Sequence, residues 1–135
     1  MKLFLDDIRE PYWLYDDYDK WVTVKNFEEF KNVIQNNIKN VEIISFDNDL
    51  GMDEGNNILP DGYSCLNWLI ENDIYVKGII VHSDNIIANE QIFGKAGNWH
   101  KFLVDEKIFN ENDIFIMKRP AMSNLTNTYK KRETN

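Results

Sequence analysis

The chain has 135 residues, of which 43% are hydrophobic and 13% aromatic, and its formal net charge is -8. This length fits one domain of ordinary size, and the hydrophobic content is too high for a disordered chain. The negative charge argues against a long nucleic acid as a partner, because such binding relies on a face rich in lysine and arginine. A small phosphorylated ligand remains compatible with an acidic chain, since a metal ion can supply positive charge locally.

The cysteine content and the lengths of the apolar runs limit the cellular compartments in which we expect the protein. Cys65 is the single cysteine, so an intrachain disulfide is excluded and a reducing compartment fits. The apolar block at the amino end is too short for a signal peptide, and no apolar run has the length of a membrane span. We therefore expect a cytoplasmic protein that has no membrane partner.

The first predicted strand ends in two aspartates. Residues 2–5 form an apolar run that stops at Asp6 and Asp7, the pattern of a buried strand whose carboxyl end opens onto a site. Residues 10–20 show no periodicity and predict a loop.

A second strand is predicted over residues 21–24, and a helix follows it. Asn26 and Glu29 have the spacing of a helix N-cap and its reciprocal partner. Apolar residues then recur at helical spacing and predict one buried stripe, made of Phe27, Phe30, Val33, Ile34 and Ile38.

The most apolar strand of the chain is predicted over residues 41–46. It ends in the run Asp47, Asn48 and Asp49. Residues 52–60 are rich in glycine, asparagine and acids, and they predict a loop beside this run that could act as a lid.

The second half of the chain continues the alternation of helices and strands. The expected elements are a helix that opens at Asp61 and Gly62, a strand over 78–81, short helices over 86–93 and 98–104, and a strand over 114–117. His82 and Ser83 follow the first of these strands, and Lys118 and Arg119 follow the second.

This order of elements predicts an α/β fold with a doubly wound, mostly parallel five-stranded sheet and helices on both faces. We place the domain at residues 1–122, followed by a polar, frayed tail over 123–135. Ligands of such sheets bind beyond the carboxyl ends of the strands, where the winding direction reverses. The acidic residues lie at such ends.

Four carboxylates at two strand ends predict a metal site, and they are Asp6, Asp7, Asp47 and Asp49. At close range in a partly desolvated site these groups would repel one another, and a cation would offset that repulsion. Oxygen ligands favour Mg²⁺, and Mn²⁺ is the alternative if His82 joins them.

Polar residues at the other strand ends are candidates for catalysis and for phosphate binding. His82 directly follows an apolar strand and precedes Ser83, which favours a catalytic role, although a lone histidine is often a hydrogen-bonded structural residue. Arg9, Lys118 and Arg119 are candidates for binding a phosphate group, with solvated surface positions as the alternative.

Four motifs occur in the order LFLDD, SFDNDLG, DGY and VHSDN. With them, residues 2 to about 93 resemble the receiver superfamily, and more closely its branch of cyclic-phosphate processing receiver-like domains. The resemblance implies a receiver-like, flavodoxin-like fold. It also implies roles at the strand ends: Asp6 and Asp7 as the metal-binding pair, Asp47 as the phosphoacceptor, Ser83 as the switch hydroxyl, and Lys118 or Arg119 as the lysine that follows the fifth strand in that family.

Two residues depart from the pattern of phosphorelay receivers. Asp49 adds a carboxylate two residues after Asp47, and His82 precedes Ser83, and both resemble the D-x-D and H-S signatures of the cyclic-phosphate branch. This implies hydrolysis of a cyclic nucleotide or of a 2′,3′-cyclic phosphate end. In a metal-dependent mechanism we expect Asp49 to orient water or to bind a second ion, and His82 to protonate the leaving oxygen. Alternatively, Asp47 itself attacks phosphorus and forms an aspartyl phosphate that water hydrolyses. Two alternatives stay open: a stand-alone receiver phosphorylated on Asp47, and a non-catalytic module that binds a nucleotide or a protein.

Overall fold

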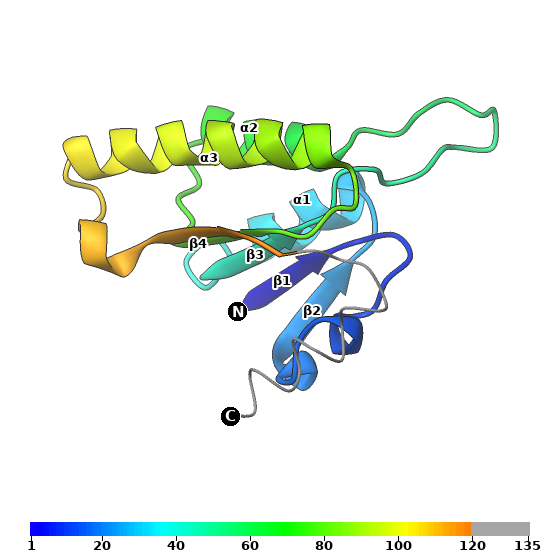
Figure 1. Ribbon diagram of the computed structural model, residues 1–135, viewed down its shortest axis with the longest axis horizontal. Coiled ribbons are helices and arrows are strands. Elements are labelled where there is room, and N and C mark those ends of the chain that lie inside the picture. The colour runs from blue at the N-terminus through cyan, green and yellow to red at the C-terminus, as the bar shows by residue number, and fades with distance from the viewer. Residues whose placement is uncertain (120–135) are drawn as a thin grey trace.

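The computed structural model describes residues 1–119, which fold into a five-stranded parallel sheet covered by three α-helices (Figure 1). The strands are β1 (Lys2–Leu5), β2 (Trp21–Val24), β3 (Ile43–Phe46), β4 (Gly78–Val81) and β5 (Phe115–Lys118). The helices are α1 (Phe27–Asn36), α2 (Gly62–Glu71) and α3 (Ile86–Asp105), with the short 3₁₀ helices η1 (Pro11–Trp13), η2 (Tyr18–Lys20) and η3 (Glu111–Asp113). The predicted domain boundary at 122 and the predicted tail over 123–135 lie outside the described residues.

The strand order is β2-β1-β3-β4-β5, and every neighbouring pair is parallel. The chain steps from β1 to β2 in one direction and then crosses back to β3 and continues the other way. The winding therefore reverses between β1 and β3, which is where ligands bind in sheets of this kind. This order confirms the predicted flavodoxin-like α/β fold.

One face of the sheet carries the main hydrophobic core. Alternate strand residues, among them Leu5, Phe46 and Val81, pack there against buried side chains from all three α-helices. The first helix begins as predicted, because the Asn26 side chain accepts a hydrogen bond from the backbone N–H of Glu29 at 2.9 Å. The N-cap of α2 is Asp61, as the sequence also predicted.

The other face of the sheet is covered by the segment between β1 and β2. Leu14, Tyr15 and Trp21 pack on Phe4 and Ile80 in a second, smaller cluster. In the part of the chain that the structure describes, the predicted helical cover of this face consists of η1 and η2 (Figure 1).

Two local predictions were wrong. Residues 86–105 form one helix rather than two, because the buried residues Ile92, Ala96, Trp99 and Leu103 keep helical spacing across residues 94–97, where a break was predicted. Ile38 lies beyond the end of α1 and is 51% exposed, so it does not belong to the buried stripe. Among the described residues, no helix is long and apolar enough to cross a membrane.

Gly62 ties the start of α2 to the end of β3, and this contact yields a first prediction. Its N–H donates to the carbonyl of Asn48 at 2.8 Å, and a Cβ placed on Gly62 would lie 2.0 Å from the backbone oxygen of Asp47. We expect Gly62→Ala to lower the free energy of unfolding by about 1–3 kcal/mol, because backbone atoms must shift to admit the methyl group.

Gly94 is the matched control for this substitution. It lies in α3, and a Cβ placed on it would meet no other atom within 4 Å, so Gly94→Ala should instead stabilise the protein by about 0.5–1 kcal/mol. Urea unfolding of both variants checks the pair. Equal effects of the two substitutions would contradict the tight approach of α2 to the end of β3.

Candidate functional site

The strand register brings four polar residues to one level of the sheet. Leu5, Phe46, Val81 and Lys118 are paired across the strands, so the residues that follow them stand at the same edge. Backbone hydrogen bonds extend this alignment past the strand ends, from Asp47 to Leu5 at 2.9 Å and from His82 to Phe46 at 2.9 Å. The four residues at this level are Asp6, Asp47, His82 and Arg119.

Three carboxylates converge at the point where the winding reverses. Asp6, Asp7 and Asp47 each offer one oxygen, and these oxygens all lie within 4.8 Å of one another. Asp6 and Asp47 are buried and Asp7 is half-buried. We call these three residues the carboxylate cluster. The fourth predicted metal ligand, Asp49, is exposed and lies outside the cluster.

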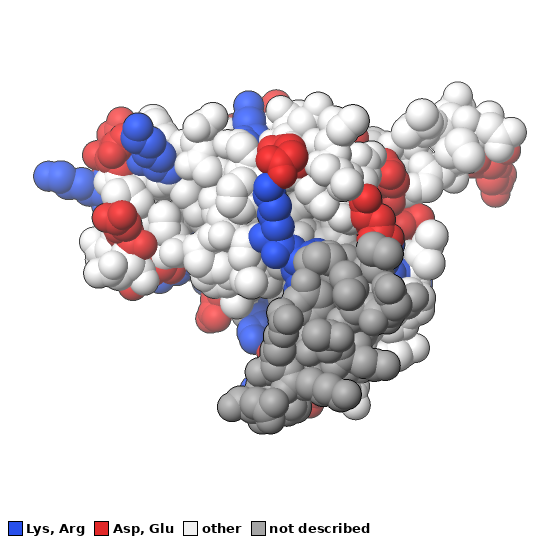
Figure 2. All heavy atoms as spheres, in the orientation of Figure 1, with Lys and Arg blue, Asp and Glu red and all other residues white. Residues whose placement is uncertain are grey.

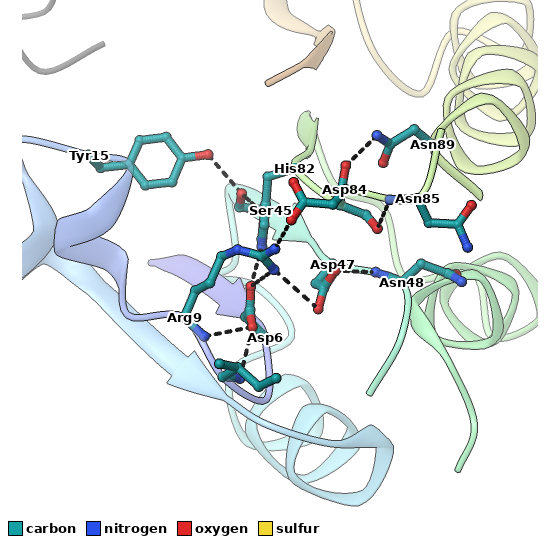
Figure 3. Close-up of polar contacts among 12 residues, drawn as sticks. Asp6, Arg9, Tyr15, Ser45, Asp47, Asn48, His82, Asp84, Asn85 and Asn89 are labelled. Carbon is teal, nitrogen blue, oxygen red and sulfur yellow. Dashed lines mark hydrogen bonds and ion pairs between the residues drawn. The ribbon is translucent and has the colours of Figure 1, made fainter. Parts of the chain in front are cut away.

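Arg9 is the counter-charge of the carboxylate cluster. One guanidinium nitrogen lies 3.3 Å from Asp6 Oδ2 and 3.9 Å from Asp47 Oδ2, and the other pairs with Asp84 (Figure 3). The predicted phosphate-binding arginine therefore does reach the site, where acids from the ends of β1, β3 and β4 hold it.

The carboxylates differ in how well the protein stabilises their charge. Burial works against ionisation of Asp6, but hydrogen bonds from His82 and from the backbone N–H groups of Ile8 and Arg9 lower its pKa. Burial and the neighbouring charge of Asp6 raise the pKa of Asp47 from 3.8 to about 7. The fold thus stabilises one negative charge and leaves the next one at Asp47 poorly compensated.

A pocket of about 300 Å³ opens over the cluster. Its lining comes from the loops that follow β1, β3 and β4, and comprises Asp7, Ile8, Arg9, Asp47, Asp49, Gly51, Ser83, Asp84 and Asn85. We call it the acidic pocket. Figure 2 shows acidic side chains gathered where the loop between β3 and α2 projects from the body of the molecule. Asp49 and Ser83, both predicted from the sequence, line this pocket beside the cluster.

Other cavities lie away from these groups. A larger one, of about 770 Å³, is found at the amino ends of the strands and is lined in part by Tyr75, Lys77, Phe109 and Phe115. Its lining includes none of the residues predicted from the sequence to bind metal or phosphate or to act in catalysis, and among the described residues the converging carboxylates lie elsewhere. The acidic pocket is therefore the better candidate site despite its smaller volume.

His82 stands behind the acidic pocket and does not line it. The ring is fully buried and stacks on Phe4, with the ring centroids 4.7 Å apart. Nε2 lies 3.0 Å from Asp6 Oδ2, and Nδ1 lies 2.6 Å from Ser45 Oγ. The structure places the imidazole in contact with a carboxylate of the cluster, at a distance from any ligand in the pocket.

Lys118 and Arg119 are not brought into the acidic pocket. Successive residues of a strand point to opposite faces, so the two cations diverge. Lys118 pairs with Glu90 on the helix side, and Arg119 lies over the ring of Tyr15 on the other side, 4.7 Å from its centroid. Among the described residues, Arg9 is the cation that lines the acidic pocket.

Three polar residues of this region were given no role in the site from the sequence, although Ser45 and Asp84 lie within the motifs SFDNDLG and VHSDN. Asp84 pairs with Arg9, and Ser45 and Tyr15 connect to His82 behind the pocket. Ser45 carried a signal, since it is a hydroxyl in the middle of the most apolar strand. The irregular segment 10–20 has several tyrosines, and no pattern in the sequence distinguishes the buried Tyr15 from the exposed Tyr12 and Tyr18.

The residues present fit a divalent cation. The donor set of the carboxylate cluster is all oxygen, which suits Mg²⁺ or Mn²⁺, and the poorly compensated charge at Asp47 is one that a cation would stabilise. The predicted involvement of His82 as a ligand is disfavoured, because both of its nitrogens already contact protein groups.

The raised pKa of Asp47 predicts a particular pH dependence of stability. Folded protein keeps the Asp47 proton up to about pH 7, whereas the unfolded chain loses it near the ordinary value of 3.8. Metal-free protein should therefore lose stability as the pH rises from 4 to 7. In Asp47→Asn this loss disappears, and the variant should exceed the wild type by roughly 2 kcal/mol at pH 8.

Thermal or urea unfolding in EDTA at pH 4 and pH 8 measures this effect. The two proteins should have similar stability at pH 4, where both side chains are neutral. A variant that is less stable than the wild type at pH 8 would contradict the poorly compensated carboxylate at position 47.

Comparison with known proteins identifies one family. The sequence model of the cyclic-phosphate processing receiver domain matches residues 1–98. Searches of curated proteins and of solved structures gave no match. The matched range includes the carboxylate cluster and every residue that lines the acidic pocket, and β5 lies beyond it.

Proposed function

The chain belongs to the family of cyclic-phosphate processing receiver domains, and from this premise we propose that it hydrolyses a small cyclic phosphate at the acidic pocket with the help of a divalent metal ion. The observation that carries the proposal is the convergence of Asp6, Asp7 and Asp47 within 4.8 Å at the reversal of the sheet. These residues would hold Mg²⁺ or Mn²⁺, which supplies positive charge for a phosphate group and acidifies water.

Arg9 and Ser83 are the residues that would bind the phosphate group. Arg9 presents a guanidinium to the pocket, and this group is suited to bidentate contact with phosphate oxygens. Ser83 Oγ accepts a hydrogen bond from the backbone N–H of Asn85 at 3.0 Å, so its own proton can be donated to a ligand. The two side chains come from the segments after β1 and β4 and line the pocket together with Asp47.

Hydrolysis joins water to phosphorus and breaks one ring P–O bond, giving a phosphomonoester and a hydroxyl group. Two acids line the pocket outside the carboxylate cluster, Asp49 and Asp84. Asp84 is paired with Arg9, so we assign Asp49 to take the proton from the attacking water. The leaving oxygen takes its proton from solvent, because the pocket is open. The net reaction consumes one water and needs no other reactant.

The role of His82 differs from the acid catalyst expected from the sequence. A ring that is fully buried and hydrogen-bonded to Asp6 cannot reach a leaving oxygen in the acidic pocket. We assign it instead to holding Asp6, in the way that groups behind metal ligands orient those ligands.

Exposed aliphatic side chains around the pocket would contact the rest of the ligand. Ile8 is 72% exposed, Ile86 76% and Ile87 73%, and all three lie in or next to the loops that line the acidic pocket. Such a rim suits the sugar and base of a mononucleotide. The acids nearby, such as Asp84, oppose the phosphates of a longer strand.

Phosphorylation of Asp47 is the second candidate function. It is supported by the position of Asp47 at the end of β3, beside Asp6 and Ser83. Lys118 and Arg119 are the two candidates for the lysine of such receivers, but Lys118 pairs with Glu90 and Arg119 lies over the ring of Tyr15, and neither lines the acidic pocket. This placement favours hydrolysis over phosphoryl transfer to the protein.

The direct test is ³¹P NMR with Mg²⁺ and two classes of substrate, 2′,3′-cyclic and 3′,5′-cyclic nucleoside monophosphates. We expect one class to give a phosphomonoester signal that EDTA abolishes. Asp49→Asn should slow the reaction by about 100-fold through loss of the proton acceptor. Asp47→Asn should slow it at least as much through loss of a metal ligand.

Glu54→Gln is the matched control, since it removes an exposed acid from the same loop without touching the acidic pocket. It should keep wild-type turnover. Turnover that survives Asp47→Asn and Asp49→Asn alike would contradict the proposal. An acyl-phosphate signal on the protein after incubation with acetyl phosphate, with no cyclic turnover, would support the receiver alternative. Tight binding of a cyclic nucleotide without product would support a binding module.

A further inference from the structure

A buried chain of hydrogen bonds runs from the carboxylate cluster to the other face of the sheet. His82 bridges Asp6 Oδ2 at 3.0 Å and Ser45 Oγ at 2.6 Å, and Ser45 Oγ lies 2.7 Å from the hydroxyl of Tyr15 (Figure 3). All four side chains are at most 4% exposed. We call these residues the buried hydrogen-bond chain.

The donor and the acceptor of each bond in the buried hydrogen-bond chain can be assigned in order. Asp6 Oδ1 accepts from the backbone N–H groups of Ile8 and Arg9, as a carboxylate does, so Asp6 accepts from His82 Nε2–H as well. In a neutral ring Nδ1 is then an acceptor, and Ser45 donates to it. Burial lowers the pKa of His82, which favours that neutral ring.

Tyr15 is the last donor of the buried hydrogen-bond chain. Because Ser45 donates its own proton to His82, Tyr15 donates its hydroxyl proton to Ser45 Oγ. Its ring is fixed by stacking on Trp21, with centroids 4.3 Å apart, and by an edge contact with Phe4 at 6.2 Å. The Arg119 guanidinium lies over the ring, 4.7 Å from its centroid. The ring contacts therefore fix the Tyr15 hydroxyl, and the Tyr15 hydroxyl in turn fixes the orientation of the Ser45 hydroxyl.

We propose that Ser45 and Tyr15 are positioning residues of the metal site, which act through the ring of His82 to hold Asp6 in the orientation of a ligand. Neither residue lines the acidic pocket. The inference rests on the metal-binding part of the proposed function and is independent of hydrolysis.

The experiment combines ¹⁵N NMR of the histidine ring with calorimetric titration of Mg²⁺. The chain has two histidines, so His100→Gln leaves the His82 ring signals alone in the spectrum. In metal-free wild type we expect Nε2–H and an unprotonated Nδ1. In Ser45→Ala the Nδ1 resonance should move downfield because it loses its donor, and Mg²⁺ affinity should fall by about tenfold.

Tyr15→Phe is the milder variant, because it removes one hydroxyl and keeps the stacked ring. We expect a smaller loss of Mg²⁺ affinity, about threefold, and a shift of Nδ1 in the same direction. Tyr12→Phe is its matched control, on the same segment but half exposed, and should change neither quantity. If Ser45→Ala does not fold, Tyr15→Phe against Tyr12→Phe decides the question.

Three results would overturn the proposal. The first is a His82 ring protonated on Nδ1 in the metal-free wild type. The second is a Mg²⁺ affinity that is unchanged in both Ser45→Ala and Tyr15→Phe. The third is an absence of Mg²⁺ binding in the wild type, which would also remove the metal site of the proposed function. Binding of Mg²⁺ without turnover of any cyclic phosphate would refute hydrolysis alone and leave this role intact.

Discussion

Repulsion among carboxylates that the sheet forces together is the constraint on which the rest of this structure depends. Parallel pairing of β1 with β3 fixes Asp6 and Asp47 at one level, and Asp7 follows within reach. Moving them apart would require breaking strand register, which would turn the buried rows of both strands outward. The chain therefore keeps the acids together and surrounds them with groups that stabilise negative charge.

This stabilisation is uneven, and the unevenness is what gives the site its chemistry. Asp6 receives two backbone N–H groups, the His82 ring and a share of Arg9. Asp47 receives the backbone N–H of Asn48 at 2.9 Å and a distant share of Arg9, and its pKa stays high at about 7. A cation bound by Asp6 and Asp47 would gain most of its binding free energy from the charge of Asp47, because the charge of Asp6 is already stabilised by the protein. The site thus combines one ligand of fixed orientation with one charge that the protein leaves for the cation to stabilise.

Much of the site could be predicted because the end of a strand is marked by a local sequence pattern. Apolar runs that stop at Asp6 and Asp47 locate the carboxyl ends of two strands, and parallel pairing brings those ends together whatever the loops do. The helix starts at Asn26 and Asp61 were predictable for the same reason, since a cap depends on neighbours three residues away.

The parts that could not be predicted depend on where side chains point in three dimensions. His82 was expected in the pocket, but its side chain lies on the same face of the sheet as those of Phe4 and Ser45, which turns the ring inward behind Asp6. Lys118, the last residue of β5, and Arg119 diverge by strand alternation, which the sequence allowed in either register. Tyr15 comes from a segment without periodicity, so its contact with Ser45 exists only in the folded chain.

The measurement that tests the account most directly is a crystal structure with Mn²⁺ and a slowly hydrolysed cyclic phosphorothioate, located by anomalous scattering of the metal. The account predicts a single Mn²⁺ peak between Asp6, Asp7 and Asp47, with the phosphorothioate beside it in contact with Arg9 and Ser83. A metal or ligand bound elsewhere, for example in the cavity lined by Tyr75 and Phe109, with the carboxylate cluster unchanged, would contradict it.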